Sequence, residues 1–414
     1  MKSEVFLKNR ENLFKSLEEN SAVILFAGKA PKKTADELYS FTPNRNFYYL
    51  TGIDEEEIAL VLVKKEDLEK TILFVKEPDL EREKWVGKSI RANEAKEKGG
   101  FTEVQYTKDF EGTIHGFIFK DEVEKIYLDL EKDSFSERET LAEEFARNLK
   151  NKYPQITIKN IYNKIAELRL IKSSEEIENM QKAIDITIEG VEALMKNSKP
   201  GIMEYELEAY YDFVCKRRGA KDFAFKTIAA AGVNATILHY VDNNSLIKDG
   251  DLILFDLGSQ YEYYNGDITR TFPVNGKFTE RQKQVYEAVL RVNKRVTEEI
   301  KPGVNWGDIN NKATEWIAEE CIALGLIEDK KDVRKYYWHS IGHSLGLDTH
   351  DVGKRNVDLK PGMVFTVEPG IYIEEEGIGI RIEDDVLVTE KGNEVLTKNM
   401  IKEVEEIEEF FKNR

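Results

Sequence analysis

The stretch "DLGSQYEYYNGDITRT", residues 256–271, begins with an aspartate and contains a second one, Asp267, eleven residues later. The four residues before it, 252–255, are all apolar, which is typical of a buried strand. Asp267 directly follows an Asn-Gly pair, which is typical of a hairpin turn. The stretch therefore predicts a buried strand that ends at Asp256 and a hairpin that brings a second carboxylate back towards it.

The same arrangement occurs a second time further along the chain. "KDGDLILFDLG", residues 248–258, aligns without gaps with "KPGMVFTVEPG", residues 360–370, at an offset of 112 residues. Each half also contains a helix-like segment with a similar start, "KPGIMEYEL" in one half and "KPGVNWGDI" in the other. These repeats predict two half-domains of helices and hairpins, related by a pseudo-twofold axis. Such an axis would bring four acids to one place, namely Asp256, Asp267, Glu368 and Glu383.

Four carboxylates at the ends of buried strands cannot all ionise without compensation, because burial and mutual repulsion raise their pKa values. Taken singly, each acid has an ordinary interpretation as a turn, capping or surface residue, but their common register favours a metal site. Two divalent cations would balance four carboxylates, and an oxygen-rich site without thiolate favours manganese-like ions over a structural zinc. A pair of such ions activates water and polarises a carbonyl, which predicts hydrolysis of an amide or ester.

Four of the five histidines lie after residue 238, and three of them fall within twelve positions. His339, His343 and His350 belong to the glycine-containing segment "HSIGHSLGLDTHD", and His239 follows an apolar run. His339 and His343 have the i,i+4 spacing of a zinc-binding helix. However, no glutamate follows His339, and the glycines oppose a stable helix. One or more of these imidazoles is therefore expected at the acidic site, but not on a zinc-protease helix.

The length of 414 residues predicts two domains rather than one core. Alternating segments in the first part predict an α/β domain, with strands at 22–26, 47–51, 58–63, 71–75 and 125–130 and helices at 8–19 and 137–151. Ser173 stands three residues before Glu176, which predicts the capped start of a helix. The expected organisation is an N-terminal α/β domain at 1–155, a linker helix region at 156–172 and a third segment, carrying the acids and histidines, at 173–414.

Composition limits the class of partner. The chain is 41% hydrophobic and 34% charged, with a net charge of −17 and no basic block, which disfavours nucleic acid and anionic membranes. No stretch approaches 18 apolar residues, and the N-terminal segment lacks an apolar signal core. The two cysteines, Cys215 and Cys321, are interpreted as buried thiols, so a cytoplasmic location is expected.

Seven blocks resemble one known family: "NFYYLTGIDEEEIALVLV" from residue 46, "LRLIKSSEEI" from 168, "ILHY" from 237, "FDLGSQYEYYNGDITRTFP" from 255, "HSIGHSLGLDTHDVG" from 339, "VEPGIY" from 367 and "IRIEDD" from 380. They resemble the creatinase/aminopeptidase family of "pita-bread" metallopeptidases, and within it the aminopeptidase P (Xaa-Pro aminopeptidase) branch. The resemblance spans nearly the whole chain. It implies an α/β (α+β) protein in which a smaller N-terminal α/β domain precedes a pita-bread catalytic domain with a pseudo-twofold repeat.

The resemblance also implies roles for individual residues. It implies two divalent cations, with manganese expected and cobalt or zinc as alternatives, held by Asp256, Asp267, His343, Glu368 and Glu383. A hydroxide between the ions would attack the scissile carbonyl while Glu368 accepts or shuttles its proton. The other implied roles are His350 as a donor to the tetrahedral intermediate, His239 and His339 as contacts near the leaving proline, Arg381 as a group that orients the acids and Thr269 as a donor to a bridging carboxylate.

The activity implied is removal of the N-terminal residue from peptides with proline in second position, by a homo-oligomer (dimer or tetramer) that acts on proline-containing peptides. The nearest alternative is prolidase, an Xaa-Pro dipeptidase with the same ligands, although the "ILHY" block and the flanking segments favour aminopeptidase P. Methionine aminopeptidase is disfavoured by the large N-terminal domain, and creatinase by a metal-ligand set that would be idle. A non-catalytic binding module with this fold is disfavoured because no ligand position is lost.

Overall fold

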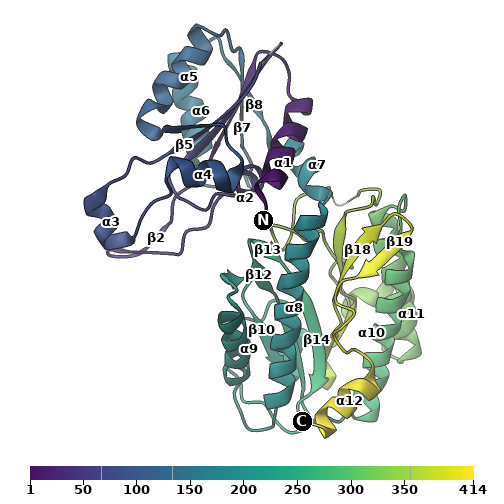
Figure 1. Cartoon of the computed structure of the whole chain (residues 1–414). Helices are drawn as coiled ribbons and strands as arrows, with labels where there is room; N and C mark the ends of the chain where they lie inside the picture. The colour runs from purple at the N-terminus through teal and green to yellow at the C-terminus, as the bar shows by residue number, and fades with distance from the viewer. Residues whose placement is uncertain (67, 133, 355) are drawn as a thin grey trace. The chain divides into compact units, whose positions relative to one another are not determined.

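The computed structural model describes residues 1–66, 68–132, 134–354 and 356–414, and the chain divides into two compact units, Met1–Arg169 and Leu170–Arg414 (Figure 1). The division falls inside the segment 156–172 that the sequence assigns to a linker, at the end of helix α7 (Tyr162–Leu170). Each unit contains its own cluster of buried apolar side chains.

The first unit is built on a six-stranded mixed sheet with the strand order β6-β5-β4-β1-β7-β8. At its centre, β1 (Ser21–Phe26) pairs antiparallel with β4 (Ala59–Lys65) and parallel with β7 (Lys125–Leu128). The other strands are β5 (Leu68–Val75), β6 (Glu103–Tyr106) and β8 (Thr157–Asn160), with a separate hairpin of β2 (Lys32–Thr34) and β3 (Glu37–Leu38). Four of the five strands predicted from the sequence are thereby confirmed.

Helices α5 (Phe110–Phe119) and α6 (Leu141–Lys152) pack on one face of this sheet. Their apolar side chains meet alternate residues of the central strands, such as Ile24 and Val61, because side chains on one face of a strand recur every second position. The remaining helices of the unit before α7 are α1 (Ser3–Ser16), α2 (Arg45–Thr51), α3 (Leu80–Val86) and α4 (Ala92–Gly99). The predicted helices at 8–19 and 137–151 correspond to α1 and α6.

Residues 47–51 form helix α2, so the strand predicted there is wrong. Aromatic side chains favour strands in general, but here the local capping decides. The Asn44 side chain accepts the N–H of Phe47 at 2.8 Å, and Gly52 ends the helix at φ 64°. Arg10 of α1 donates to the carbonyl oxygen of Leu50 at 2.7 Å, which satisfies a group that the end of the helix leaves exposed.

The second unit contains the predicted repeat. In the first half, β11 (Leu252–Leu257) pairs antiparallel with β14 (Ile268–Pro273), and the short strands β12 (Ser259–Tyr261) and β13 (Tyr264–Asn265) lie between them in sequence. In the second half, β15 (Val364–Val367) pairs with β18 (Asp384–Thr389), and the hairpin of β16 (Gly370–Ile373) and β17 (Ile378–Arg381) lies between them. The strands outside the repeat are β9 (Asp222–Phe223), β10 (Ile228–Ala231) and β19 (Gly392–Val395).

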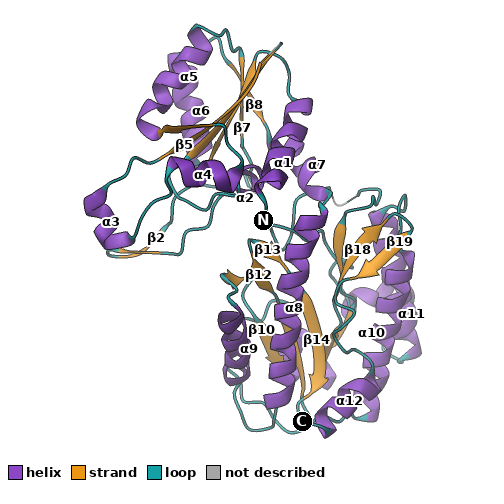
Figure 2. Ribbon diagram, in the orientation of Figure 1, coloured by secondary structure: helices purple, strands orange, loops and turns teal. Residues whose placement is uncertain are grey.

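Helices complete each half of the repeat. Helix α8 (Ser174–Asn197) packs against α9 (Glu204–Arg218), and α10 (Glu280–Glu299) packs against α11 (Trp306–Ala323). Figure 2 shows these two pairs on either side of β14, with α12 (Val404–Lys412) at the end of the chain. The predicted cap of α8 is present, because the Ser173 side chain accepts the N–H of Glu176. Among the described residues, no helix is long and apolar enough to span a bilayer.

The tight turn of the first half lies three residues earlier than the Asn-Gly pair predicts. Tyr261 pairs with Tyr264, which leaves Glu262 and Tyr263 as a two-residue turn with positive φ at both positions. Gly266 has a different function: a Cβ atom there would lie 3.0 Å from the backbone nitrogen of Ile184, so glycine permits close packing against α8.

The first acids of the two halves, Asp256 and Glu368, occupy equivalent positions in the repeat, but the second acids do not. Asp256 pairs with Thr269 across the β11–β14 ladder. Glu368 follows the last pair of the β15–β18 ladder by one residue, so it stands opposite Glu383. The position that holds a threonine in the first half thus holds a glutamate in the second.

The same register places an arginine where the first half has an aspartate. Arg381 pairs with Gly370, and the equivalent glycine, Gly258, stands opposite Asp267 when the β11–β14 ladder is continued by one residue. The four acids do line one cavity, as the repeat in the sequence predicts, but the second acids of the two halves are not equivalent positions.

Candidate metal centre

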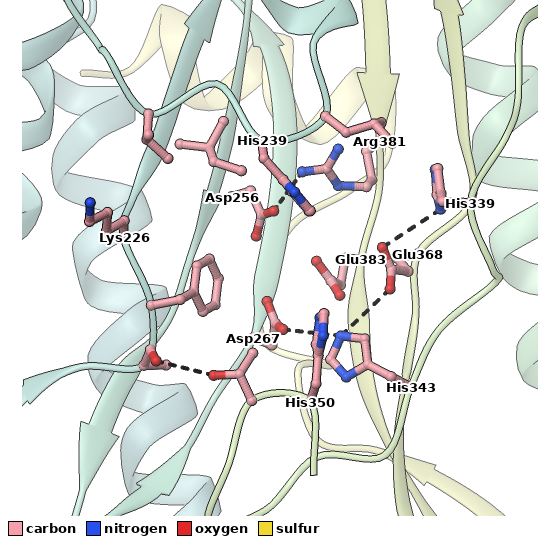
Figure 3. A pocket seen from close by; sticks show the side chains of 16 residues that line it. Lys226, His239, Asp256, Asp267, His339, His343, His350, Glu368, Arg381 and Glu383 are labelled. Atoms are coloured by element: carbon pink, nitrogen blue, oxygen red, sulfur yellow. Dashed lines mark hydrogen bonds and ion pairs between the residues drawn. The ribbon is translucent and has the colours of Figure 1, made fainter. Parts of the chain in front are cut away.

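A cavity of about 440 Å³ opens in the second unit, where the strands of the two halves end (Figure 3). Part of its lining is apolar and comes from Ala224, Phe225, Ile228, Leu238 and Val241. The polar part brings together nine of the residues that the sequence singles out: Asp256, Asp267, Glu368, Glu383, His239, His339, His343, His350 and Arg381.

Each of the four acids stands at or next to the end of a strand. Asp256 is the last but one residue of β11, and Glu368 follows β15 directly. Asp267 directly precedes β14, and Glu383 directly precedes β18. Because β11 pairs antiparallel with β14, and β15 with β18, the end of one strand lies beside the start of its partner. This geometry collects side chains that are at least eleven residues apart in the sequence.

His343 turns an unprotonated nitrogen towards the acids. Its Nδ1 lies 3.1 Å from the carbonyl oxygen of Ser344, which only accepts, so Nδ1 carries the proton and Nε2 the free lone pair. Nε2 lies 3.5 Å from Asp267 Oδ2 and 3.6 Å from Glu368 Oε1. Ligand atoms of Asp267, His343 and Glu383 all lie within 4.8 Å of one another. A ring held in this way by a carbonyl has the tautomer and orientation of a metal-binding histidine.

Two buried oxygens of this group, Oδ1 of Asp256 and Oδ1 of Asp267, have no hydrogen-bond partner among the described residues. Buried polar atoms are normally satisfied, so these two oxygens indicate a partner other than a protein donor. Carboxylate oxygens and one imidazole nitrogen, without thiolate, suit a hard or intermediate divalent cation. The side chains around the cavity therefore fit a divalent metal ion.

The surroundings oppose ionisation of three of the acids, Asp267, Glu368 and Glu383. Burial raises the pKa of Glu368 to about 8. The pKa values of Asp267 and Glu383 also lie well above their ordinary values, because of burial first and neighbouring carboxylates second. Burial, followed by the repulsion of the His350 imidazole, lowers the pKa of His343 to about 4. The imidazole therefore stays neutral, and cations are the natural source of compensating charge.

The stabilisation that a divalent cation gives to this protein is expected to increase with pH. An acid whose pKa is higher in the folded than in the unfolded protein stabilises the folded state fully at a pH below its unfolded pKa, which is 4.5 for a glutamate. For Glu368, this stabilisation is lost as the pH rises towards the folded pKa of about 8. A cation needs the ionised oxygens and relieves their repulsion. Calorimetry should therefore show a larger rise in thermal midpoint on adding manganese at about pH 8 than at about pH 5.5. An equal rise at both pH values would contradict these pKa directions.

Arg381 connects acids from both halves of the repeat. Its side chain is buried, and its Nη2 donates to Asp256 Oδ2 at 2.6 Å while its Nε donates to Thr269 Oγ1 at 3.0 Å. Thr269 Oγ1 in turn donates to Glu383 Oε2 at 2.7 Å. The guanidinium thus holds one carboxylate directly and orients another through a hydroxyl group.

Tyr372 belongs to the same network, although the sequence analysis does not single it out. Its hydroxyl accepts from Arg381 Nη1 at 3.1 Å, so its own proton points to His339 Nε2 at 2.9 Å. His339 Nδ1 lies 2.8 Å from the carbonyl oxygen of Ser340, so both ring nitrogens are engaged. Burial, followed by the charge of Arg381, lowers the pKa of His339 to about 3. This ring therefore offers its carbon surface to a ligand. No local pattern marks the tyrosine, because its partners are distant in sequence.

His239 and His350 differ from the other two histidines of the cavity in being exposed. His239 follows the short 3-10 helix Gly232–Thr236, and the ring centroid of His350 lies 4.2 Å from that of His343. Both side chains point into the cavity in Figure 3. Their rings are therefore accessible to a molecule bound beside the acids.

Comparison with known families and proteins extends these observations to the whole chain. A model of metallopeptidase family M24 matches residues 178–390, and a model of the aminopeptidase P N-terminal domain matches residues 6–127. The Xaa-Pro aminopeptidase of Haemophilus influenzae is 37% identical over 98% of this chain and 96% of its own length. The Xaa-Pro aminopeptidase of Escherichia coli is 35% identical over 97% of this chain and 96% of its own. The Xaa-Pro dipeptidase of Mus musculus is 32% identical over 98% and 92%.

Solved structures give the same result. A Bacillus anthracis protein assigned as an aminopeptidase P is 49% identical and matches with a TM-score of 0.98, covering 100% of this chain and 99% of its own. Aminopeptidase P of Escherichia coli with the inhibitor Pro-Leu is 33% identical, with a TM-score of 0.92 and the same coverage. These matches confirm the pita-bread architecture and the preceding α/β domain. The chain, with its aminopeptidase P N-terminal domain, therefore belongs to metallopeptidase family M24.

Proposed function

We propose that this chain is an Xaa-Pro aminopeptidase, which hydrolyses the bond between the N-terminal residue and a proline in second position. The observation that carries the proposal is the cavity in which four carboxylates and the Nε2 atom of His343 face one another. The similarity to Xaa-Pro aminopeptidases over nearly the full length, including the N-terminal unit, supports this activity among those of the family.

We propose five residues as the metal ligands, namely Asp256, Asp267, His343, Glu368 and Glu383. Two divalent cations, manganese in our proposal, supply an activated water molecule and a polarised carbonyl when they are bound. Asp267 and Glu383 would supply buried negative charge to the cations, which agrees with their deep burial and strongly raised pKa values.

Glu368 is the proposed proton acceptor. Burial raises its pKa to about 8, so its carboxylate is a stronger base than an ordinary glutamate, and a bound cation would favour its ionised form. One carboxylate oxygen of Glu368 would take the proton from the attacking water. The same oxygen would then give the proton to the amine of the leaving proline. His339, whose Nδ1 lies 3.9 Å from Glu368 Oε2, stays neutral beside it.

The exposed histidines are the proposed contacts to the peptide. His350 would donate to the oxygen of the scissile carbonyl as negative charge develops there. His239 would contact the peptide beyond the cleaved bond. His339, with both nitrogens engaged, would contact the proline ring through carbon atoms. An Xaa-Pro bond lacks an N–H group and has a rigid ring, so a site for it must hold the ring rather than pair with the backbone.

Cleavage of an Xaa-Pro-Xaa tripeptide by the metal-loaded protein is the test of this function. Chelator treatment should abolish turnover, and manganese should restore it better than magnesium, because the imidazole ligand and carboxylates suit manganese. An Xaa-Pro dipeptide is the matched control substrate, since the alternative activity, Xaa-Pro dipeptidase, would cleave only that. Undiminished turnover in a metal-free sample would contradict the metal-dependent mechanism, and cleavage of the dipeptide alone would assign the alternative activity.

The cytoplasmic location and a dimeric or tetrameric state also belong to this proposal. The two cysteines, Cys215 and Cys321, are buried free thiols, which agrees with a reducing compartment. Light scattering on the purified protein measures the oligomeric state directly.

A further inference from the structure

A buried ion pair lies next to the histidine-containing segment 339–350, and it belongs neither to the proposed metal ligands nor to the proposed peptide contacts. Lys172 Nζ and Asp351 Oδ2 are 3.0 Å apart, and each side chain is only 1% exposed. Lys172 comes from the "LRLIKSSEEI" segment at the start of the second unit, and Asp351 directly follows His350. The two charges are 179 residues apart in sequence.

The pair is attached to two of the segments that carry proposed metal ligands of the second half, those of His343 and Glu368. The backbone N–H of Lys172 donates to the carbonyl oxygen of Gly362 at 2.9 Å, in the turn before β15. The backbone N–H of Asp351 donates to the carbonyl oxygen of Ser344 at 2.9 Å, and Ser344 Oγ donates to the carbonyl oxygen of Asp351 at 2.6 Å. These two hydrogen bonds join Ser344 and Asp351, the two ends of the loop, to each other. The side chain of Lys172 then binds the loop through the carboxylate of Asp351.

Gly346 shows how tightly this loop is built around the ion pair. A Cβ atom at this position would lie 2.2 Å from Asp351 Oδ2 and 2.9 Å from Lys172 Cε. The carbonyl oxygen of Gly346 also accepts from the backbone N–H and the Nδ2 of Asn265, at 3.0 and 3.2 Å, from the first half of the repeat. Gly346, one of the glycines that oppose a zinc-binding helix, therefore leaves the space in which the Asp351 carboxylate contacts the Lys172 ammonium group.

A buried ion pair adds little net stability, because the desolvation of two charges offsets their attraction, but it strongly favours one geometry. Here the geometry is that of the residue next to His350. We propose that Lys172 is a positioning residue for the reaction: by holding Asp351, it orients the His350 ring towards the substrate carbonyl. This inference rests on the proposed role of His350.

The test combines Lys172→Met with His350→Ala in a double-mutant cycle on the manganese-loaded enzyme. Lys172→Met should lower kcat for the tripeptide by about 10-fold to 10²-fold, as expected for a small misplacement of a reacting group. KM and the content of two metal ions should not change. In the His350→Ala background, Lys172→Met should cause no further loss, because it acts through that ring. Lys172→Arg, which keeps the charge, should restore part of kcat.

A general loss of stability would give a different pattern. Leu194→Ala is the control for this pattern. Leu194 is fully buried in α8, 20 residues and about 30 Å along the helix from Ser174. Its replacement should lower the thermal midpoint without changing kcat per folded molecule. The inference is overturned if Lys172→Met leaves kcat unchanged, if its effect multiplies with that of His350→Ala, or if it acts through loss of metal. If Lys172→Met does not fold, Asp351→Asn takes its place in the same cycle.

A readout without activity separates this inference from the proposed function. In the metal-free protein, the imidazole resonances of His350, assigned by their absence in His350→Ala, should shift in Lys172→Met while those of His115 in the first unit stay in place. Unchanged His350 resonances would overturn the inference even if the enzyme cleaves tripeptides. A wild-type protein that cleaves no Xaa-Pro peptide would refute the proposed function, and the resonances would still decide whether Lys172 positions the ring.

Discussion

Asp267→Ala is expected to lower turnover of an Xaa-Pro-Xaa tripeptide by several orders of magnitude while the protein stays folded. Asp267 is 3% exposed, and its Oδ2 atom lies 3.5 Å from the lone-pair nitrogen of His343. Alanine removes one of four negative charges that would balance two cations, so at least one metal ion should be lost. The folded state should survive, because the substitution also removes a carboxylate whose ionisation is opposed by burial.

Metal content and kcat measured on one sample decide this prediction. Asp185→Ala is the matched control, since this aspartate lies exposed on α8 and accepts one hydrogen bond, from Gln181. It should retain both metal ions and full activity. Near-normal turnover of Asp267→Ala with two bound metal ions would show that the proposed ligand set is wrong.

His350→Ala is expected to lower kcat and kcat/KM together by about 10²–10³-fold, the usual cost of losing one donor to a developing oxyanion. The two parameters should fall together because the contact forms mainly in the transition state. The ring is exposed in the cavity, so its removal should leave the thermal midpoint and the metal content unchanged. A core histidine would instead show its effect in stability.

His115→Ala serves as the control for this substitution. His115 lies in the first unit, where its Nδ1 is 2.8 Å from the hydroxyl oxygen of Tyr153, and its loss should not affect turnover. A His350→Ala enzyme that keeps two metal ions and works within a few-fold of wild type would refute the donor role. Loss of metal in that variant would instead point to His350 as a ligand, in competition with His343.

The candidate site could be located from the sequence because its acids belong to a repeat. Strands such as β11 and β15 are apolar runs with an acid at or just after the end, and the offset of 112 residues relates Asp256 to Glu368. The repeat does not predict that Arg381 occupies the position that corresponds to Asp267 in the first half. That correspondence depends on how the strands pair. The register appears only when both strands of each ladder are placed.

Features that depend on distant partners could not be predicted. Tyr372 and Lys172 look like ordinary residues in their local sequence, and their significance comes from contacts with His339 and Asp351. The erroneous strand at 47–51 has the same origin, since side chains of α1 satisfy the end of helix α2. Local propensity therefore gives the elements with strong periodicity, whereas buried polar contacts decide the short ones.

The division of the four acids between two halves of one unit has a consequence for biosynthesis. The first hairpin, with Asp256, leaves the ribosome more than 100 residues before Glu368 does, so it cannot complete the site when it forms. When the halves meet, four carboxylates approach one another at the moment when water is excluded from them. Docking of the halves is therefore the step at which bound cations, or protonation of the acids, would have to offset this repulsion.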